Sequence, residues 1–430
     1  MNKINSQLAV RGGKAIRKTS WPIWPQGDRT TQKFLIDVLN SGRWGIGGKY
    51  NGKKLFEQRF AHAFARFHAS AFCVPVVNGS AALAVALEAL GVTFGDEVIV
   101  PGLAWISCAT AVIKIGAIPI LVDIDPETLC ISPSAARLAI NNQTKAIIVI
   151  HSYCTVADLD ALVALSKETG IPIIEDCSQA HGAIWKGQRV GTFGKIGVYS
   201  MGNSKVLTCG EGGVAITNDP KIYECMQQLR GDGYRYKDSK PVLGQSQLEE
   251  SGMVQGYNYC LSEFQAAVLL SGLKTLNRQN KKREENGEYL KKLCSDIDGV
   301  QPLYRYAAVN HLTYFRFCIR LNLEEFGSAT IDQIRRALIA ELNESSIELV
   351  DYPLTKNPLY KPLNSPAAYS SIVHRNRLDP LRFNLPIALQ AHKECITFHH
   401  AMLLGSKRDI EDIATSIRKL KANSKELAYV

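Results

Sequence analysis

The chain has 430 residues, of which 46% are hydrophobic and 21% charged, proportions that exclude a disordered or fibrous protein and suggest about two globular domains. Fifty basic residues against forty acidic ones give a net charge of +10, but the basic residues are scattered. The densest run, Lys281-Lys282-Arg283, is followed at once by Glu284 and Glu285. This pattern is typical of a solvated helix face, so we expect no nucleic-acid partner.

The cysteines and the apolar stretches indicate a reducing compartment. None of the eleven cysteines forms a C-x-x-C pair, and several, such as Cys108 and Cys318, stand in apolar runs as small hydrophobic side chains. The first residues lack the apolar core of a signal peptide. The most apolar stretch, 98–122, is broken by prolines and glycines and suits a buried strand–helix–strand. We therefore expect a cytoplasmic protein with no membrane partner.

From residue 70 to 218, short β-branched runs alternate with helical patterns. This alternation predicts an α/β fold with a mostly parallel, doubly wound sheet, whose ligands bind at the carboxyl ends of the strands. The expected strands are Phe72–Val77, Glu97–Pro101, Ile118–Asp123, Lys145–His151, Ile171–Asp176, Gly197–Met201 and Gly213–Thr217. The expected helices include Ala81–Leu90, Cys108–Ile115, Pro133–Ile140 and Leu159–Lys167.

The pattern changes after residue 260. Leu261–Lys292 predicts one or two long helices, followed by a strand over Tyr314–Arg320 and a helix over Ile331–Leu342. Ser406 and Asp409 form a capping-box pattern before the last helix. We expect an N-terminal arm (1–45), a large domain (46–270) and a smaller C-terminal α/β domain (271–430).

Three groups of residues carry candidate chemistry. Gly79 and Ser80 leave a strand and open a helix, where free N–H groups suit a phosphate, although an ordinary N-cap explains the pattern as well. Asp176 ends an apolar strand, where a carboxylate needs a cationic partner or a turn to cap. Lys205 stands between a buried strand and a Gly-rich turn, where partial burial lowers a lysine pKa and favours Schiff-base chemistry, although a solvated lysine also fits.

Together these groups match the needs of pyridoxal 5′-phosphate (PLP): a phosphate anchor, an acid for the pyridinium nitrogen and an aldehyde-binding lysine. Trp105 offers a stacking face for the ring, or else is a core residue. Several neighbours are interpreted as structural. We expect His181 on the exposed side of its strand end and Glu175 as a surface or capping residue. We interpret Arg230 as a surface arginine, although it could also meet a substrate carboxylate. We expect a packed histidine, and no metal site, at His399-His400.

Five segments carry a resemblance to the DegT/DnrJ/StrS-type aminotransferases, from about Trp21 to the C-terminus. They are Asn-Gly-Ser-Ala-Ala-Leu at 78–83, Gly-Asp-Glu-Val-Ile-Val-Pro at 95–101, Glu-Asp-Cys-Ser-Gln-Ala-His-Gly at 175–182, residues 200–213, and Gly-Tyr-Asn-Tyr-Cys-Leu-Ser-Glu-Phe-Gln-Ala-Ala at 256–267. The resemblance implies a fold-type I PLP-dependent transferase. It also implies a homodimer with shared active sites.

The resemblance also implies roles for particular residues. Lys205 binds the cofactor aldehyde as a Schiff base and moves the proton, and Asp176 keeps the pyridine nitrogen protonated. The remaining cofactor contacts that it implies are Gln179 at the ring oxygen, Trp105 stacked on the ring, Gly79, Ser80 and Ser200 at the phosphate, and Asn258 reaching over from the second subunit.

Within the family, the chain is most similar to the branch of L-glutamine:scyllo-inosose and L-glutamine:2-deoxy-scyllo-inosose aminotransferases. The features are Trp-Pro-Ile-Trp-Pro at 21–25, Arg43-Trp44 and the 258–264 segment. This similarity implies ping-pong transfer from L-glutamine or L-glutamate to a cyclitol or sugar ketone in antibiotic-type metabolism. Ala104, Cys154 and Met201 depart from common family residues, which leaves the acceptor open.

Alternatives are an aromatising 3-amino-5-hydroxybenzoate synthase, a nucleotide keto-sugar aminotransferase and a non-enzymatic relative. Lys205 argues against the sugar 3-dehydratases of the family, which carry histidine at that position.

Overall fold

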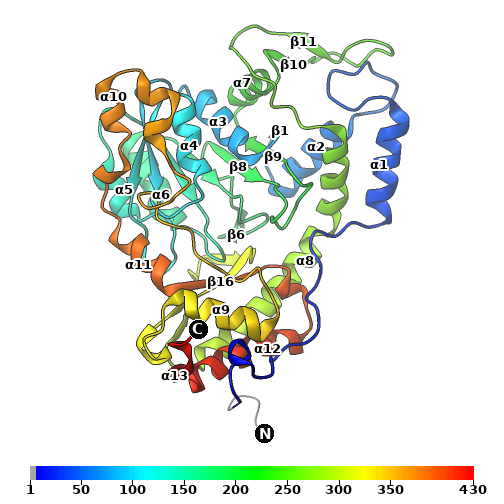
Figure 1. Cartoon of the computed structure of the whole chain (residues 1–430). Coiled ribbons are helices and arrows are strands. Elements are labelled where there is room, and N and C mark those ends of the chain that lie inside the picture. The colour runs from blue at the N-terminus through cyan, green and yellow to red at the C-terminus, as the bar shows by residue number, and fades with distance from the viewer. Residues whose placement is uncertain (1–5) are drawn as a thin grey trace.

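The computed structural model describes residues 6–430 and is built around a large seven-stranded sheet and a smaller four-stranded one (Figure 1). The large sheet has the order β1-β9-β8-β5-β4-β2-β3, and only β9 runs against its neighbours. The predicted α/β fold with a mostly parallel sheet is thus confirmed. Its strands are β1 (Phe72–Val76), β2 (Glu97–Pro101), β3 (Ile118–Val122), β4 (Thr144–Ile150), β5 (Ile173–Asp176), β8 (Ile196–Ser200) and β9 (Gly213–Thr217).

Helices cover both faces of this sheet, which explains why its strands are nearly continuous apolar runs. Apolar side chains of α5 (Pro133–Ala139) and α6 (Leu159–Thr169) pack on one face with Ile99, Ile147 and Ile173. The other face carries α2 (Phe56–His68), α3 (Gly79–Ala89) and α4 (Ser107–Lys114), and α7 (Pro220–Arg230) packs beside α3. The predicted strands and helices of this region are all present, with bounds that differ by at most two residues.

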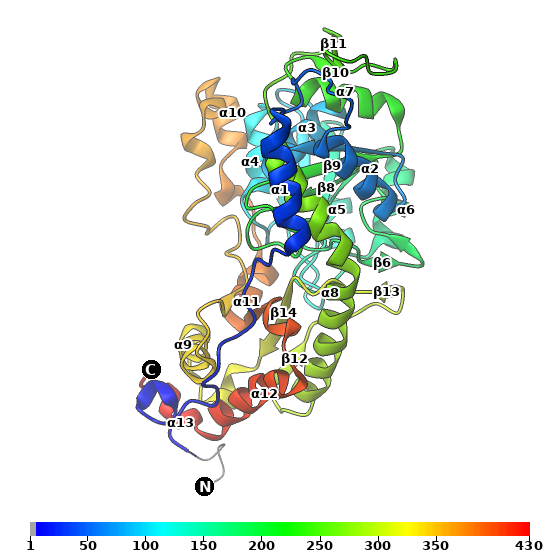
Figure 2. The same cartoon turned by 90° about the vertical axis from the view of Figure 1, so that its right-hand side faces the viewer.

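One helix, α8 (Glu263–Ser295), links the two sheets (Figure 2). Its capping box is formed by Ser262 and Gln265, and α1 (Arg29–Ser41) packs along its first half. The predicted division between the large and small domains, at residues 270 and 271, falls inside this continuous helix. The prediction of a solvated face at 281–283 was wrong for Arg283, which is fully buried because its side chain points into the protein.

The smaller sheet has the order β12-β14-β16-β15 and is antiparallel. The predicted helix over Ile331–Leu342 has those bounds, and the capping box of Ser406 and Asp409 begins α12 as predicted. The strands are β12 (Val300–Pro302), β14 (Arg316–Leu321), β15 (Glu348–Leu349) and β16 (Cys395–His399), and the helices are α9 (Ile331–Leu342), α10 (Ile372–Arg377), α11 (Pro386–Glu394), α12 (Lys407–Ala422) and α13 (Ser424–Leu427).

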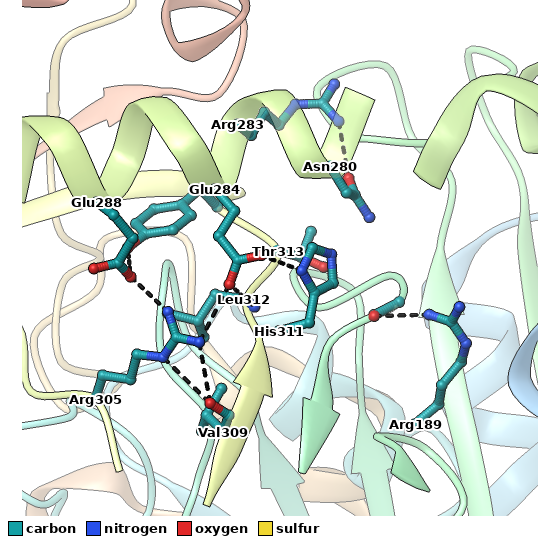
Figure 3. Close-up of polar contacts among 12 residues, drawn as sticks. Arg189, Asn280, Arg283, Glu284, Glu288, Arg305, Val309, His311, Leu312 and Thr313 are labelled. Atoms are coloured by element: carbon teal, nitrogen blue, oxygen red, sulfur yellow. Dashed lines mark hydrogen bonds and ion pairs between the residues drawn. The ribbon is translucent and has the colours of Figure 1, made fainter. Parts of the chain in front are cut away.

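Two minor sheets complete the fold. One consists of β13 (Val309–His311), β6 (Ile184–Trp185) and β7 (Gln188–Arg189), and the other of β10 (Tyr234–Tyr236) and β11 (Leu248–Glu250). Side chains of α8 hold the first of these sheets, since Glu284 accepts hydrogen bonds from His311 and from the Leu312 N–H group (Figure 3).

The described part of the predicted N-terminal arm, residues 6–45, contacts both halves of the molecule. The N–H groups of Ala9 and Ile16 donate to Glu341 of α9, and α1 packs on α8. The first five residues of the predicted arm lie outside the described part. Within residues 6–430, no helix has the length and apolarity needed to cross a membrane.

Candidate active site

A cavity of about 370 Å³ lies between the carboxyl ends of the large-sheet strands and the smaller domain. It brings together seven of the eight predicted site residues: Gly79, Ser80, Trp105, Asp176, Gln179, Ser200 and Lys205. The smaller domain closes the cavity with residues that no sequence motif marks, namely Phe315, Arg316, Glu348, Leu349 and Asp351. The carboxyl ends of parallel strands lie at the same edge of a sheet, so residues far apart in sequence come together here.

The first turn of α3 forms the part of the cavity suited to an anion. The Asn78 side chain caps the helix by accepting from the Ala81 N–H group, and the first N–H groups of a helix have no partner within it. Gly79 lies against Ser200 at the end of β8, and a Cβ atom added to Gly79 would stand 2.6 Å from the Ser200 Cβ. Glycine is therefore required for the loop and the strand end to meet.

Asp176 is buried at the end of β5 and held on two sides. One carboxylate oxygen accepts from the Ser178 N–H group at 3.0 Å, and the other accepts from the Cys108 thiol at 3.3 Å. Burial, reinforced by the Asp176 charge, raises the pKa of the Cys108 thiol well above its ordinary value. The thiol therefore stays protonated and donates to Asp176, fixing the direction of the carboxylate.

Lys205 lies within the cavity with its ammonium group 4.4 Å from the centre of the Phe315 ring. Burial lowers the pKa of Lys205, and the carboxylates of Asp176 and Asp351 oppose that shift. The backbone around it is fixed by two buried or half-buried donors, since Trp24 Nε1–H donates to the Lys205 carbonyl and His400 Nε2–H to the Ser204 carbonyl. The main chain of the lysine is thus fixed, and its ammonium group lies over the Phe315 ring.

Tyr153 connects the two halves of the cavity. Its N–H group donates to Gln179 Oε1 at 2.6 Å, and its hydroxyl donates to the Asp351 carboxylate at 3.1 Å. Burial raises the pKa of the Tyr153 hydroxyl well above its ordinary value, so it remains a donor. Trp105, by contrast, is 54% exposed at the cavity. The core interpretation of Trp105 was therefore wrong.

Asn258 lies outside this cavity. It is exposed and follows Tyr257 in a segment whose next residues pair with the end of β1, through the Val76–Cys260 bridge. Its side-chain oxygen accepts from the Cys260 N–H group within the same segment. On its own chain Asn258 therefore makes no approach to Lys205.

Three expectations of surface exposure were wrong, each because a partner distant in sequence satisfies a buried polar group. His181 is buried, its Nε2–H donates to the Ser200 carbonyl, and burial lowers its pKa to about 3. Glu175 is buried, so its surface interpretation was wrong, but it accepts from the N–H groups of residues 191, 193 and 194, in agreement with the capping interpretation. Arg230 is buried and pairs with Glu57 at 2.6 Å.

One buried cluster among the described residues, His151 with Glu175 and Cys177, has the donor atoms of a metal site. The Ala157 N–H group donates to His151 Nδ1, so the proton is on Nε2, which donates to Glu175. With Glu175 also bound to backbone N–H groups, its oxygens are satisfied by the protein itself. The donor atoms of His151 and Glu175 are therefore already used in hydrogen bonds that stabilise the fold.

Sequence similarity to known proteins extends over nearly the whole chain. Residues 25–418 match the model of the DegT/DnrJ/EryC1/StrS aminotransferase family. The chain belongs to this family. Two similar relatives are an L-glutamine:2-deoxy-scyllo-inosose aminotransferase of Streptoalloteichus tenebrarius and an L-glutamine:scyllo-inosose aminotransferase of Streptomyces griseus. The first is 44% identical over 98% of this chain and 99% of the relative, and the second 43% identical over 99% and 100%.

Solved structures of similar proteins have the same fold. A 3-amino-5-hydroxybenzoic acid synthase is 29% identical, with a TM-score of 0.78 over 96% of this chain and all of the other. S. venezuelae DesV, in complex with a ketimine intermediate, is 27% identical, with a TM-score of 0.75 over 91% of this chain and 94% of the other. The predictions of an aminotransferase and of its fold class are thus confirmed.

Proposed function

We propose that this chain is a PLP-dependent aminotransferase that moves the amino group of L-glutamine, or of L-glutamate, to the ketone of a free cyclitol. The observation that carries the proposal is the meeting of Lys205, Asp176 and the first turn of α3 in one cavity. Relatives at 44% and 43% identity whose names specify L-glutamine and a scyllo-inosose support the substrate class.

The residues of the cavity fit PLP as a set. Gly79 lies close to Ser200 at the N-terminus of α3, where the phosphate would bind. The Ser80 and Ser200 hydroxyls would be further donors. Asp176 would face the pyridine nitrogen, Gln179 the ring oxygen and Trp105 the ring face. When bound, PLP supplies an aldehyde for amine capture and an electron sink for breaking the bond to the α-hydrogen.

The protein's own residues then supply binding and proton transfer. Lys205, once it is free, would take the proton from the α-carbon of the donor, and its lowered pKa makes the neutral amine available at a lower pH than in an ordinary lysine. Asp176 would stabilise a positive charge on the ring nitrogen, and its hydrogen bonds from Ser178 and Cys108 keep its carboxylate aligned. Tyr153 positions Gln179 through its N–H group.

The charges of the cavity favour an uncharged acceptor. Its lining includes four carboxylates, from Asp176, Glu211, Glu348 and Asp351, against the two cations Lys205 and Arg316. A diphosphate-linked sugar would meet this excess of acids without a second cluster of basic residues. Carboxylates suit ring hydroxyls, which donate hydrogen bonds to them. A cyclitol therefore fits better than a nucleotide keto-sugar.

The working unit that we propose is a homodimer in the cytoplasm, with Asn258 of each subunit at the phosphate of the other. Two features support the dimer: Asn258 is exposed outside its own cavity, and Trp105 is half exposed beside that cavity. All eleven cysteines are free thiols, and most are buried, which suits a reducing compartment.

The test is a separation of the two half-reactions. Holoenzyme given L-glutamine alone should lose its visible absorption and release one equivalent of 2-oxo acid, which excludes a non-enzymatic relative. After removal of the amino acid, scyllo-inosose or its 2-deoxy form should restore the absorption. Recovery only with a nucleotide keto-sugar, or release of an aromatic product from the ring substrate, would replace the proposed acceptor with one of the alternatives.

A further inference from the structure

This inference rests on the proposed function, in which two substrates of different charge bind in one cavity. The amino donor carries an α-carboxylate, whereas the cyclitol ketone carries no charge. In ping-pong transfer both occupy the same cavity in turn. A cation in the cavity would therefore gain an ion pair with the first substrate but not with the second.

Arg316 is the one guanidinium among the described residues that line the cavity, and Lys205 is the other cation there. Lys205 is committed to the reaction itself. Arg316 is the first residue of β14 and follows Phe315, whose ring faces the Lys205 ammonium group. A carboxylate bound by Arg316 would thus lie next to the group that takes the α-proton.

The guanidinium of Arg316 is paired in a way that leaves its partner replaceable. Its Nη2 atom lies 2.7 Å from a carboxylate oxygen of Glu348 on β15. The Arg316 side chain is only 12% exposed, but that of Glu348 is 55% exposed. The other polar contacts of the Arg316 guanidinium, to the Ser346 carbonyl and the Thr397 hydroxyl, are both at 3.4 Å. An exposed carboxylate on a long side chain gains little from such a pair and is readily rehydrated.

The second acid beside Arg316 behaves differently. Asp351 is held by Tyr153, whose hydroxyl both donates to its carboxylate and accepts from its N–H group. Burial raises the pKa of Asp351, and the Tyr153 hydroxyl, Arg316 and Lys205 oppose that shift. Asp351 is therefore a fixed part of the wall, while Glu348 is the movable partner.

We propose that the Arg316–Glu348 pair is a substrate switch. The α-carboxylate of the amino donor displaces Glu348 and binds Arg316, and Glu348 turns to solvent. When the 2-oxo acid leaves, Glu348 pairs with Arg316 again, so the uncharged cyclitol enters a cavity without an exposed cation. Arg316 is a specificity residue for the donor, and Glu348 competes with the donor carboxylate for Arg316.

The test compares binding of a charged and an uncharged probe to the holoenzyme by isothermal titration calorimetry. Glutaramate (5-amino-5-oxopentanoate) carries the carboxylate and amide of glutamine but no amine, and scyllo-inositol represents the ring polyol. Arg316→Gln should weaken glutaramate binding about 10- to 100-fold, because charge-assisted hydrogen bonds are lost, and leave scyllo-inositol binding within about 3-fold. Arg320→Gln, on the same strand but paired with Glu394 outside the cavity, is the matched control.

Glu348→Gln should change the affinity for glutaramate in the opposite direction. Removing the competing carboxylate should strengthen glutaramate binding about 2- to 5-fold, a change that a purely structural ion pair would not produce. Unchanged glutaramate binding in Arg316→Gln, or unchanged or weaker binding in Glu348→Gln, overturns the switch. If Arg316→Gln does not fold, the Glu348→Gln result decides: tighter binding supports the switch, and unchanged or weaker binding overturns it. Failure of the wild-type enzyme to release 2-oxo acid from glutamine would instead overturn the proposed function.

Discussion

At the scale of single residues, the site depends on groups whose surroundings set their charge. Asp176 accepts bonds from Ser178 and Cys108, so its carboxylate is oriented before any ligand arrives. Lys205 has its pKa lowered by burial, while Asp176 and Asp351 keep that shift from being larger. The amine is therefore neutral at a lower pH than an ordinary lysine, which is the state that a nucleophile needs.

The residue that decides the proposal is Lys205. In the proposed function its amine captures the aldehyde of PLP, so Lys205→Ala should lose both the visible absorption of the purified protein and its turnover. Absorbance spectra and a 2-oxo acid assay measure these two properties. Lys195→Ala, an exposed lysine just before β8, is the control and should retain both. Retention of both by Lys205→Ala would remove Lys205 from the mechanism.

At the scale of elements, α8 joins the two sheets and carries a network of charges on one side. Arg305 lies 3.2 Å from Glu284 and 2.6 Å from Glu288, and Glu284 also accepts from His311 (Figure 3). Burial opposes ionisation of Glu284, but the hydrogen bonds from His311 and the Leu312 N–H group outweigh it and lower its pKa. The network therefore holds β13, and with it β6, against the middle of the helix.

This network predicts a pH-dependent contribution to stability. Because the pKa of Glu284 is lower in the folded chain than its ordinary value of 4.5, its contribution is present above that value. It is lost as the pH falls through the folded-state pKa. Glu284→Gln should thus lower the thermal midpoint at pH 7, and the difference from the parent chain should shrink as the pH falls below 4.5 and through the folded-state pKa. Melting curves across pH measure this, and a constant difference at every pH would contradict it.

At the scale of the whole molecule, the cavity belongs to two sheets and, in the proposed dimer, to two chains. The smaller domain supplies Phe315, Arg316 and Asp351 to a site whose other residues come from the large sheet. The buried pair of Lys419 and Glu341, at 2.7 Å, lies where the N-terminal segment crosses the smaller domain. Opening between the sheets would therefore change the cavity directly.

A mixed dimer tests the sharing of sites. A Lys205→Ala chain lacks the amine, and an Asn258→Asp chain places a carboxylate against the phosphate in its partner's site. If Asn258 acts across the interface, a mixture of the two variants, refolded or coexpressed, should contain one intact site and recover activity absent from either alone. Light scattering should show a dimer. Activity no greater than the sum of the separate variants, or a monomeric mass, would contradict the shared site.

Local signals were enough for much of the fold. The bounds of β2, β9 and α9 follow from runs of apolar residues and helical spacing, and the Ser406 capping box begins α12 as predicted. Residues at strand ends were also recognisable, because the doubly wound topology gathers these ends at one edge. For this reason Asp176 and Lys205 could be predicted as candidate site residues, and the structure places both in one cavity.

Short-range patterns thus specify the alternation of strands and helices, the family, and those site residues that lie on short motifs. The burial of Arg283 and Arg230 depends instead on tertiary packing, since the groups that surround a side chain come from distant segments. The same packing makes Arg316, Glu348 and Asp351 line the cavity that holds Lys205. No local pattern marks these three, because their position depends on how the smaller sheet packs against the carboxyl edge of the large one.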